Sequence, residues 1–328
     1  MKLYVRAAVL LIGITSGVSA NSQANQPAEQ QFSSHLAQLT SAVLADPRHS
    51  LDSRALDKIM VGIKPYFRYS VAPAQQTTVN LDTYLATQVP NHKVERGLAL
   101  LQEHQGLLDK IGERFGVQPR FILALWGIRS NYGEQAGQFP VLTILASQSQ
   151  SDEAQQASFI DAVVALAQSG LSPQDFVGNR DARLGQVALT ASQYLSHGVD
   201  GDDDGKVDIW QNHADIFATI ANILKQQGWQ QEATWGRQVQ LPVDFDLSQA
   251  QAPQAFSYWQ QQGVRRFDGT DLPNVDSIRA NVIAPDGKKG RIYLVYDNYR
   301  AINAWLDNHY DSISVTYLSE RIKFPQLK

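Results

Sequence analysis

The sequence contains no cysteine, so no disulfide bond can form and no lipid can be attached through a cysteine at a cleavage point. It is also poor in charge: charged residues make up 18% of the chain, the formal net charge is −4, and there is no long basic run. This balance argues against general nucleic-acid binding. In contrast, 43% of the 328 residues are hydrophobic, which is enough for one large domain or two smaller ones with sizeable cores.

The first twenty residues have the pattern of a secretory signal peptide. Lys2 and Arg6 precede a short apolar run, and Val18-Ser19-Ala20 is a small-residue cleavage site. The run is too short to cross a membrane, and its glycines and serines argue against the alternative of an uncleaved anchor helix. We therefore expect a signal peptide over residues 1–20, a flexible leader over residues 21–31, and a mature protein that is soluble in the periplasm or secreted.

The rest of the chain, residues 32–328, is predicted to be one mainly α (α+β) domain with a few short strands, because apolar residues recur mostly at helical spacing. Its core is expected at about residues 95–235, with the N- and C-terminal parts packed on it. The tryptophans, including Trp126 and Trp305, are expected in the hydrophobic core. The predicted elements are helices over 120–131, 157–168, 215–227 and 301–305, a strand over 292–295 and an extended segment over 67–80.

The most distinctive segment is Ala-Leu-Trp-Gly-Ile-Arg-Ser-Asn-Tyr-Gly, over residues 124–133. It resembles the catalytic segment of the lysozyme-like, SLT-type lytic murein transglycosylases of the B family, where the pattern is Trp-Gly-Ile-Glu-Ser-Asn-Tyr-Gly. Further similarities, one before this segment and three after it, appear in the family's order at residues 97–101, 139–141, 200–210 and 294–299. The resemblance covers most of the mature chain and implies a lysozyme-like lytic transglycosylase fold that acts on peptidoglycan.

Arg129 occupies the position at which the resemblance places the family's catalytic glutamate. That glutamic acid protonates the leaving glycosidic oxygen, and the carboxylate then takes a proton from the sugar's C6 hydroxyl, which gives a 1,6-anhydro product. A guanidinium stays protonated and has no lone pair to accept a proton. Losing general acid–base catalysis costs on the order of 10²–10⁴ in rate. We therefore expect the lyase activity to be lost or strongly reduced.

Two carboxylates are candidates to replace the missing acid. Glu134 lies five residues beyond Arg129, which on an ideal helix turns it about 140° away. Asp181 lies in a segment that differs from the family's cleft loop, where Gly185 and Gln186 are kept and the positions after them have changed. The alternative interpretations are a solvated charge at a helix end for Glu134 and a partner of a nearby arginine for Asp181.

Arg129 shares a helical stripe with apolar residues, so its charge must reach an open cleft or an acid. It is then either a salt-bridged arginine that stabilises the cleft floor or, together with Arg183, a clamp for the carboxylates of peptidoglycan stems. Tyr132 is a candidate to stack on a sugar ring. The candidate substrate-binding residues are Ser130, Asn131, Tyr132, Arg183 and Gln186.

Alternating aspartates after residue 199 have the pattern of an EF-hand-like calcium loop. Carboxylates occupy positions 1, 3, 5 and 9, Gly205 allows the tight turn, and the Lys206 carbonyl falls at position 7. Gln211 replaces the usual glutamate at position 12, so we expect weak affinity, with Asp215 available to complete the shell. A solvated acidic turn is the alternative. The expected ligands of a structural Ca²⁺ are Asp200, Asp202, Asp204, Lys206 and Asp208.

These observations predict a periplasmic protein of the lytic murein transglycosylase family that binds peptidoglycan or muropeptides and has lost most or all of its lyase step. The first alternative is an active lytic transglycosylase that forms 1,6-anhydromuramoyl ends with Glu134 or Asp181 as the acid. The second is a scaffold that binds other cell-wall proteins and no glycan. No nucleic-acid partner is expected, and no membrane span after signal cleavage.

Overall fold

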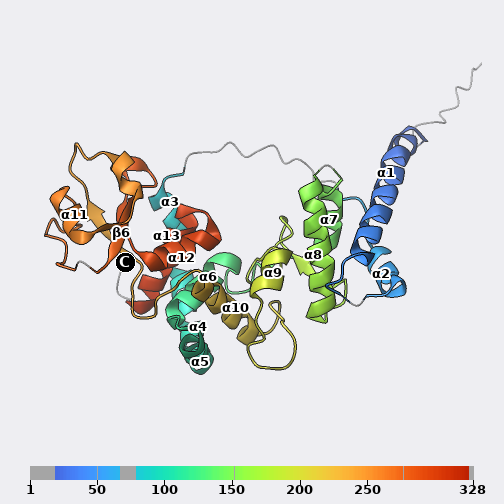
Figure 1. Ribbon diagram of the computed structural model, residues 1–328, viewed down its shortest axis with the longest axis horizontal. Helices are drawn as coiled ribbons and strands as arrows, with labels where there is room; N and C mark the ends of the chain where they lie inside the picture. The colour runs from blue at the N-terminus through green and yellow to red at the C-terminus, as the bar shows by residue number, and fades with distance from the viewer. Residues whose placement is uncertain (1–18, 50, 67–78, 151, 276, 325–328) are drawn as a thin grey trace, which may run out of the picture.

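The computed structural model of the protein describes residues 19–49, 51–66, 79–150, 152–275 and 277–324. The molecule is elongated, with a group of long helices at one end, a larger helical body in the middle and a β-sheet at the other end (Figure 1). Among the described residues, no helix is both long and apolar enough to cross a bilayer. The predicted signal peptide lies almost wholly outside the described residues, which begin at Ser19.

The helices at one end are α1 (Ser19–Leu44), α2 (Ser53–Met60), α7 (Val141–Gln148) and α8 (Glu153–Ser169). Helix α1 packs against the other three. It runs without a break through residues 21–31, where the sequence predicted a flexible leader. The alanines, glutamines and glutamate of this stretch are good helix formers, but Pro27 is not, so composition alone does not account for the unbroken helix. Helix α8 covers the predicted helix over 157–168 and ends at Gly170 in the left-handed region.

The central body is built around α6 (Pro119–Ser130), which packs against helices on several sides. Pro119 at the first helical position favours the start of α6, and Asn131 ends it with a left-handed φ of 51°. Residues 121–127 are all buried, so this helix has no solvent-facing side over two turns. The surrounding helices are α3 (Leu81–Gln88), α4 (Asn91–Glu103), α5 (Gln105–Phe115), α9 (Ala191–His197), α10 (His213–Gln226), α12 (Asp297–Leu306) and α13 (His309–Lys323).

A five-stranded antiparallel sheet forms the other end, with the order β4-β6-β7-β3-β5 and its own hydrophobic core under α11 (Phe256–Gln261). The central strand β7 is buried at all four positions, which agrees with the predicted strand over 292–295. A two-stranded sheet pairs Phe139 with Gly178 in the body. The strands are β1 (Phe139–Pro140), β2 (Val177–Gly178), β3 (Gly236–Gln240), β4 (Gln254–Ala255), β5 (Arg265–Arg266), β6 (Arg279–Ile283) and β7 (Ile292–Val295).

The prediction of a mainly helical fold with a few short strands is confirmed. The predicted helices over 120–131 and 215–227 appear as α6 and α10, each shifted by one or two residues. The predicted helix over 301–305 is the second half of α12, which begins earlier, at Asp297. Most of the predicted extended segment, residues 67–78, lies outside the described residues.

Candidate functional site

The distinctive segment ends in a tight turn that directs its side chains to opposite sides. Asn131, Tyr132 and Gly133 all have positive φ, at 51°, 56° and 89°. Ser130 holds this turn from inside, because its hydroxyl donates to the Trp126 carbonyl and accepts from the Gly133 N–H. Ser130 is buried, so its hydroxyl serves the turn and not a ligand.

Tyr132 is turned into the protein by this geometry. Only 4% of it is exposed, and its ring packs against Gly97 and Gly127, where a Cβ would come within about 3 Å of it. Its hydroxyl donates to the Lys93 carbonyl at 3.2 Å. The sequence suggested Tyr132 as a residue that stacks on a sugar ring. In the structure its side chain is buried, because the positive φ of Tyr132 turns the side chain inwards at the end of α6.

Gln186 fixes the segment to the neighbouring loop. Its Oε1 accepts from the Trp126 indole at 2.7 Å, and its Nε2 donates to the Trp210 carbonyl at 2.7 Å. The side chain is 9% exposed and also lies against Gly133. Both ends of the amide are therefore used inside the protein, and Gln186 positions the walls of the site without reaching a ligand.

Arg129 is the charged residue of this segment that faces a cavity, which Ile128 also lines. Its Nε donates to the Val187 carbonyl at 3.2 Å and its Nη2 to the Ala188 carbonyl, while its guanidinium lies 5.7 Å from the centre of the Trp305 ring. Burial lowers the pKa of Arg129 to about 10, helped by the charge of Arg183 and opposed by that of Asp311. The side chain therefore remains a cation at neutral pH.

The cavity next to Arg129 has a volume of about 280 Å³ and brings together elements far apart in the sequence. A second cavity of about 490 Å³ adjoins it, since Asp181 and Arg183 line both. Asp181 and Arg183 were predicted from the sequence as residues of the site, whereas Trp305 was expected in the core and Asp311 was not predicted. The residues that line the smaller cavity are Ile128, Arg129, Asn179, Asp181, Arg183, Ala188, Trp305, Leu306 and Asp311.

Three acidic side chains lie close enough to the site to be considered as acids. Asp311, in the first turn of α13, accepts a hydrogen bond from the Tyr84 hydroxyl at 2.5 Å. Asp181 is exposed at the junction of the two cavities. Glu134 is exposed outside both cavities, where it accepts from the Asn131 amide at 2.6 Å and lies 3.4 Å from the Arg96 guanidinium. Of the two predicted substitutes, only Asp181 shares a cavity with Arg129.

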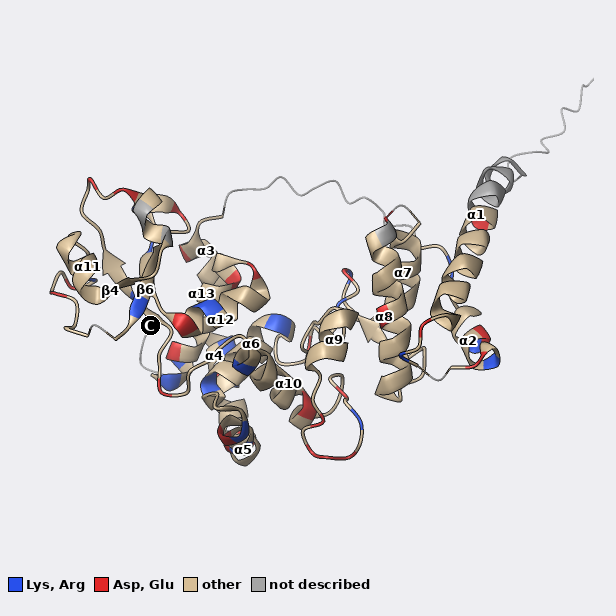
Figure 2. Cartoon of the chain, in the orientation of Figure 1, with Lys and Arg blue, Asp and Glu red and all other residues tan. Residues whose placement is uncertain are grey.

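The acidic loop lies between α9 and α10 and is visible as a red segment in Figure 2. Carboxylate oxygens of Asp200, Asp202 and Asp204 come within 4.8 Å of one another, an arrangement suited to a hard divalent cation. Asp200 accepts the N–H groups of Asp204 and Gly205, so the loop is already closed around its first residue. The donor set thus fits Ca²⁺ as far as these three carboxylates go.

The other predicted ligands are placed differently. The Asp208 carboxylate accepts the N–H groups of Trp210 and Gln211 and thereby caps the turn. Asp215 is fully buried and accepts the N–H groups of Gly201 and Asp208, one with each oxygen. Burial raises the pKa of Asp215 to about 6, although these two N–H donors lower it. Asp215 therefore joins the two ends of the loop and does not complete a metal shell.

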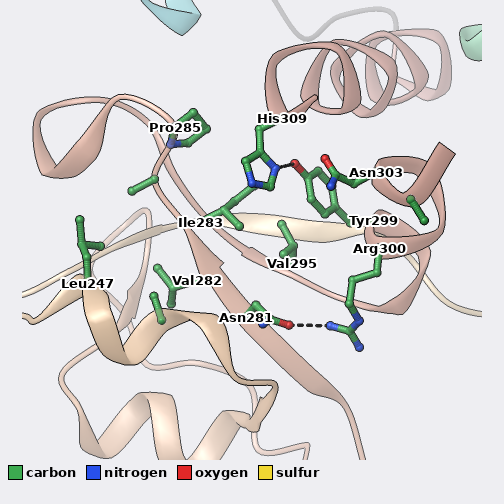
Figure 3. A pocket seen from close by; sticks show the side chains of 13 residues that line it. Leu247, Asn281, Val282, Ile283, Pro285, Val295, Tyr299, Arg300, Asn303 and His309 are labelled. Carbon is green, nitrogen blue, oxygen red and sulfur yellow. Dashed lines mark hydrogen bonds between the residues drawn. The ribbon is translucent and has the colours of Figure 1, made fainter. Parts of the chain in front are cut away.

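A larger cavity, of about 670 Å³, lies apart from this site between the sheet and helices α12 and α13. Figure 3 shows that its side chains come from both layers: Tyr299 hydrogen-bonds His309, and Arg300 donates to Asn281. Apolar residues such as Ile283 line the remaining wall. Its polar side chains already have hydrogen-bond partners within the protein, so it resembles a packing gap between the two hydrophobic cores.

The segment of residues 124–133 therefore lies largely buried beside a polar cavity, and comparison with known proteins identifies the family to which this arrangement belongs. The Transglycosylase SLT domain family matches residues 31–320. The chain therefore belongs to this family of lytic transglycosylases, as the resemblance over residues 124–133 predicted.

Individual proteins similar to this chain are also lytic transglycosylases. Membrane-bound lytic murein transglycosylase B of Escherichia coli (strain K12) is 23% identical over 140 residues, which span 42% of this chain and 38% of that protein, well under half of the curated relative. SltB3 from Pseudomonas aeruginosa, solved in complex with NAG-NAM-pentapeptide, is 28% identical, with a TM-score of 0.83 over 90% of this chain and 80% of that one. Slt35 of Escherichia coli, solved in complex with calcium, is 18% identical, with a TM-score of 0.74 over 90% and 94%, and is similar in fold.

Proposed function

We propose that this protein binds peptidoglycan strands or muropeptides in the periplasm through the cavities next to Arg129, and that its lyase step is lost or strongly reduced. The observation that carries the proposal is the place of Arg129 at the end of α6, with its guanidinium bonded to the Val187 and Ala188 carbonyls and facing the cavity. Membership of the transglycosylase family and the NAG-NAM-pentapeptide complex of SltB3 support peptidoglycan as the ligand.

A guanidinium in this position favours binding over cleavage. It cannot give up and take back a proton at neutral pH, and its charge opposes an oxocarbenium-like transition state. The same charge attracts carboxylates, with which guanidinium forms bidentate hydrogen bonds. Arg183 lies on the same cavity and adds a second cation, so the stem-peptide carboxylates of peptidoglycan are the groups that the site would hold.

An active lytic transglycosylase that uses Asp181 as its acid is the second candidate, because Asp181 lines the same cavity as Arg129. Glu134 is a weaker candidate, since it lies outside the cavity and is held by Asn131 and Arg96. A digestion of purified sacculi separates the candidates. Formation of 1,6-anhydromuropeptides that Asp181→Asn abolishes would favour the active enzyme.

Binding is tested by sedimentation with purified sacculi. We expect the wild-type protein in the pellet and the Arg129→Ala, Arg183→Ala double variant largely in the supernatant, with Arg266→Ala as a matched control on the exposed sheet edge. Wild-type protein left wholly in the supernatant would instead favour a scaffold that binds other cell-wall proteins. Equal binding of the double variant would remove the two arginines from the site.

We also propose that the acidic loop binds a structural Ca²⁺ through Asp200, Asp202 and Asp204, with the Lys206 carbonyl as a further oxygen donor. The ion would neutralise the crowded carboxylates and fix the loop. At a calcium concentration of 100 times the Kd, the free energy of unfolding would rise by about 2.7 kcal/mol. Calorimetry should show this with the wild type and with Asp271→Asn, but not with Asp202→Asn, Asp204→Asn. No heat and no rise in Tm at millimolar calcium would exclude the metal.

A further inference from the structure

Away from the Arg129 cavity, a groove of about 510 Å³ lies between α3, the start of α4 and α13. Leu85, Ala86 and Val89 form an apolar wall, while Arg291 and Arg321 contribute two cations. The guanidinium of each lies 5.8 Å from the centre of the Tyr317 ring, so this ring connects them across the groove.

Arg321 is a buried cation that lacks a counter-charge. It is 8% exposed, and among the described residues no carboxylate lies within 4.0 Å of its guanidinium. Its Nη1 donates to the Val89 carbonyl and its Nη2 to the Asn91 side chain, but its buried Nε has no partner. A buried charge without an opposite charge is costly, so the site is electrostatically incomplete without an anion.

Two further features of the groove favour an anion. Helix α4 has 13 residues and begins here, with Pro90 at its N-cap and no side chain that caps it, so the partial positive charge of its first N–H groups is not neutralised. Arg291 reaches the same groove, where Asp82 lies 2.6 Å from its Nε. Asp82 is 61% exposed, and among the described residues its ion pair is with Arg291 alone, which leaves a net positive charge at the groove.

We propose that this groove is a carboxylate-binding site for a small ligand with a short apolar chain, either the C-terminus of a short peptide or a free carboxylic acid. The carboxylate would accept from the second hydrogens of the Arg321 Nη atoms, since each of these nitrogens carries two hydrogens and uses one inside the protein. Arg291 would turn from Asp82 towards the ligand, and the apolar chain would lie on Leu85 and Val89.

Calorimetry with three probes tests the proposal on the full chain: N-acetyl-alanyl-alanine, its C-terminal amide, and propionate. We expect saturable binding of the dipeptide acid with a Kd on the order of 1 mM or tighter, and none of the amide. Propionate that binds as well as the dipeptide acid identifies a free carboxylic acid as the ligand type, and weaker binding of propionate identifies a peptide terminus. Absence of binding by both acids, or equal binding of the amide, overturns the proposal.

Arg291 and Asp82 lie on the exposed rim of the groove, so variants at these two positions should fold normally, whereas Arg321 is buried. Arg291→Gln should weaken binding about tenfold, because one charge-assisted hydrogen bond is lost. Asp82→Asn should strengthen binding severalfold, because it removes the carboxylate that competes for Arg291. Arg321→Lys keeps the charge but loses the planar donor set, so binding should weaken. Unchanged affinity in both Arg291→Gln and Asp82→Asn would place the ligand elsewhere.

Discussion

The two sides of the turn at the end of α6 differ in kind. On the inner side, Trp126, Ser130, Tyr132 and Gln186 are buried and hydrogen-bonded to one another or to the backbone. On the cavity side, Arg129 is half-buried and bonded only to loop carbonyls. Of the residues that this chain shares with the family pattern, Trp126, Ser130 and Tyr132 lie on the inner side, Ile128 lines the cavity, and the changed residue Arg129 also faces the cavity. We call the buried residues Trp126, Ser130, Tyr132 and Gln186 the frame of the site. The frame holds the turn in place, whichever side chain stands at position 129.

The largest effect on stability is expected when Trp126, at the centre of the buried side, is removed. Trp126→Ala should lower the free energy of unfolding by about 3–5 kcal/mol, because Trp126 is 2% exposed and the cavity left behind cannot fill. Trp305→Ala, on the half-buried cavity side, is the matched control and should cost about 1 kcal/mol. Urea denaturation of both variants measures the difference, and equal losses would show that the two sides do not differ.

A smaller effect is expected when only the hydrogen bonds of the frame are removed. Gln186→Leu leaves the Trp126 indole and the Trp210 carbonyl without partners in a buried place. Each unsatisfied buried group costs about 1–3 kcal/mol. Thermal unfolding should therefore show a clearly lower Tm, while Gln193→Leu, whose amide accepts from Arg183 and the Thr190 N–H near the surface, should lose less. A Gln186→Leu variant as stable as the wild type would remove Gln186 from the frame.

The smallest effect on stability, with the sharpest effect on binding, is expected on the cavity side. Arg183→Ala should change the free energy of unfolding by no more than about 0.5 kcal/mol. It should nevertheless weaken the binding of an anionic muropeptide about tenfold, because a charge-assisted hydrogen bond is lost. Titration calorimetry with Arg266→Ala as control measures this. If Arg183→Ala unfolds at a lower temperature and binds normally, Arg183 belongs to the frame.

The sequence predicted those parts of the fold that local patterns determine. Pro119 marks the start of α6, whose predicted end at residue 131 is one residue beyond the observed one, and the β-type composition of residues 292–295 identifies the strand β7. The side-chain directions in the turn were not predictable in this way. Tyr132 follows the cavity-facing residue in the sequence, yet its positive φ turns it inwards. Backbone conformation at a helix end depends on packing as well as on residue type, so the sequence did not reveal that Tyr132 is buried.

The cavity itself could be predicted only in part. Arg129 and Arg183 were identified because they stand where the family pattern changes. Trp305 and Asp311 come from the end of α12 and the start of α13, more than 170 residues after Arg129, and no local spacing connects them to it. They reach the cavity because α13 packs against α6, a long-range contact that a single sequence does not reveal.

In this protein, the guanidinium of Arg129 stands where the peptidoglycan-cleaving relatives have their proton carrier. Mass spectrometry of the products that the wild-type protein releases from purified sacculi tests this most directly, with Arg129→Glu measured beside it. We expect no 1,6-anhydromuropeptides above the no-protein blank for the wild type. Anhydromuropeptides formed by the wild-type protein, in amounts that grow with time and protein concentration, would contradict it.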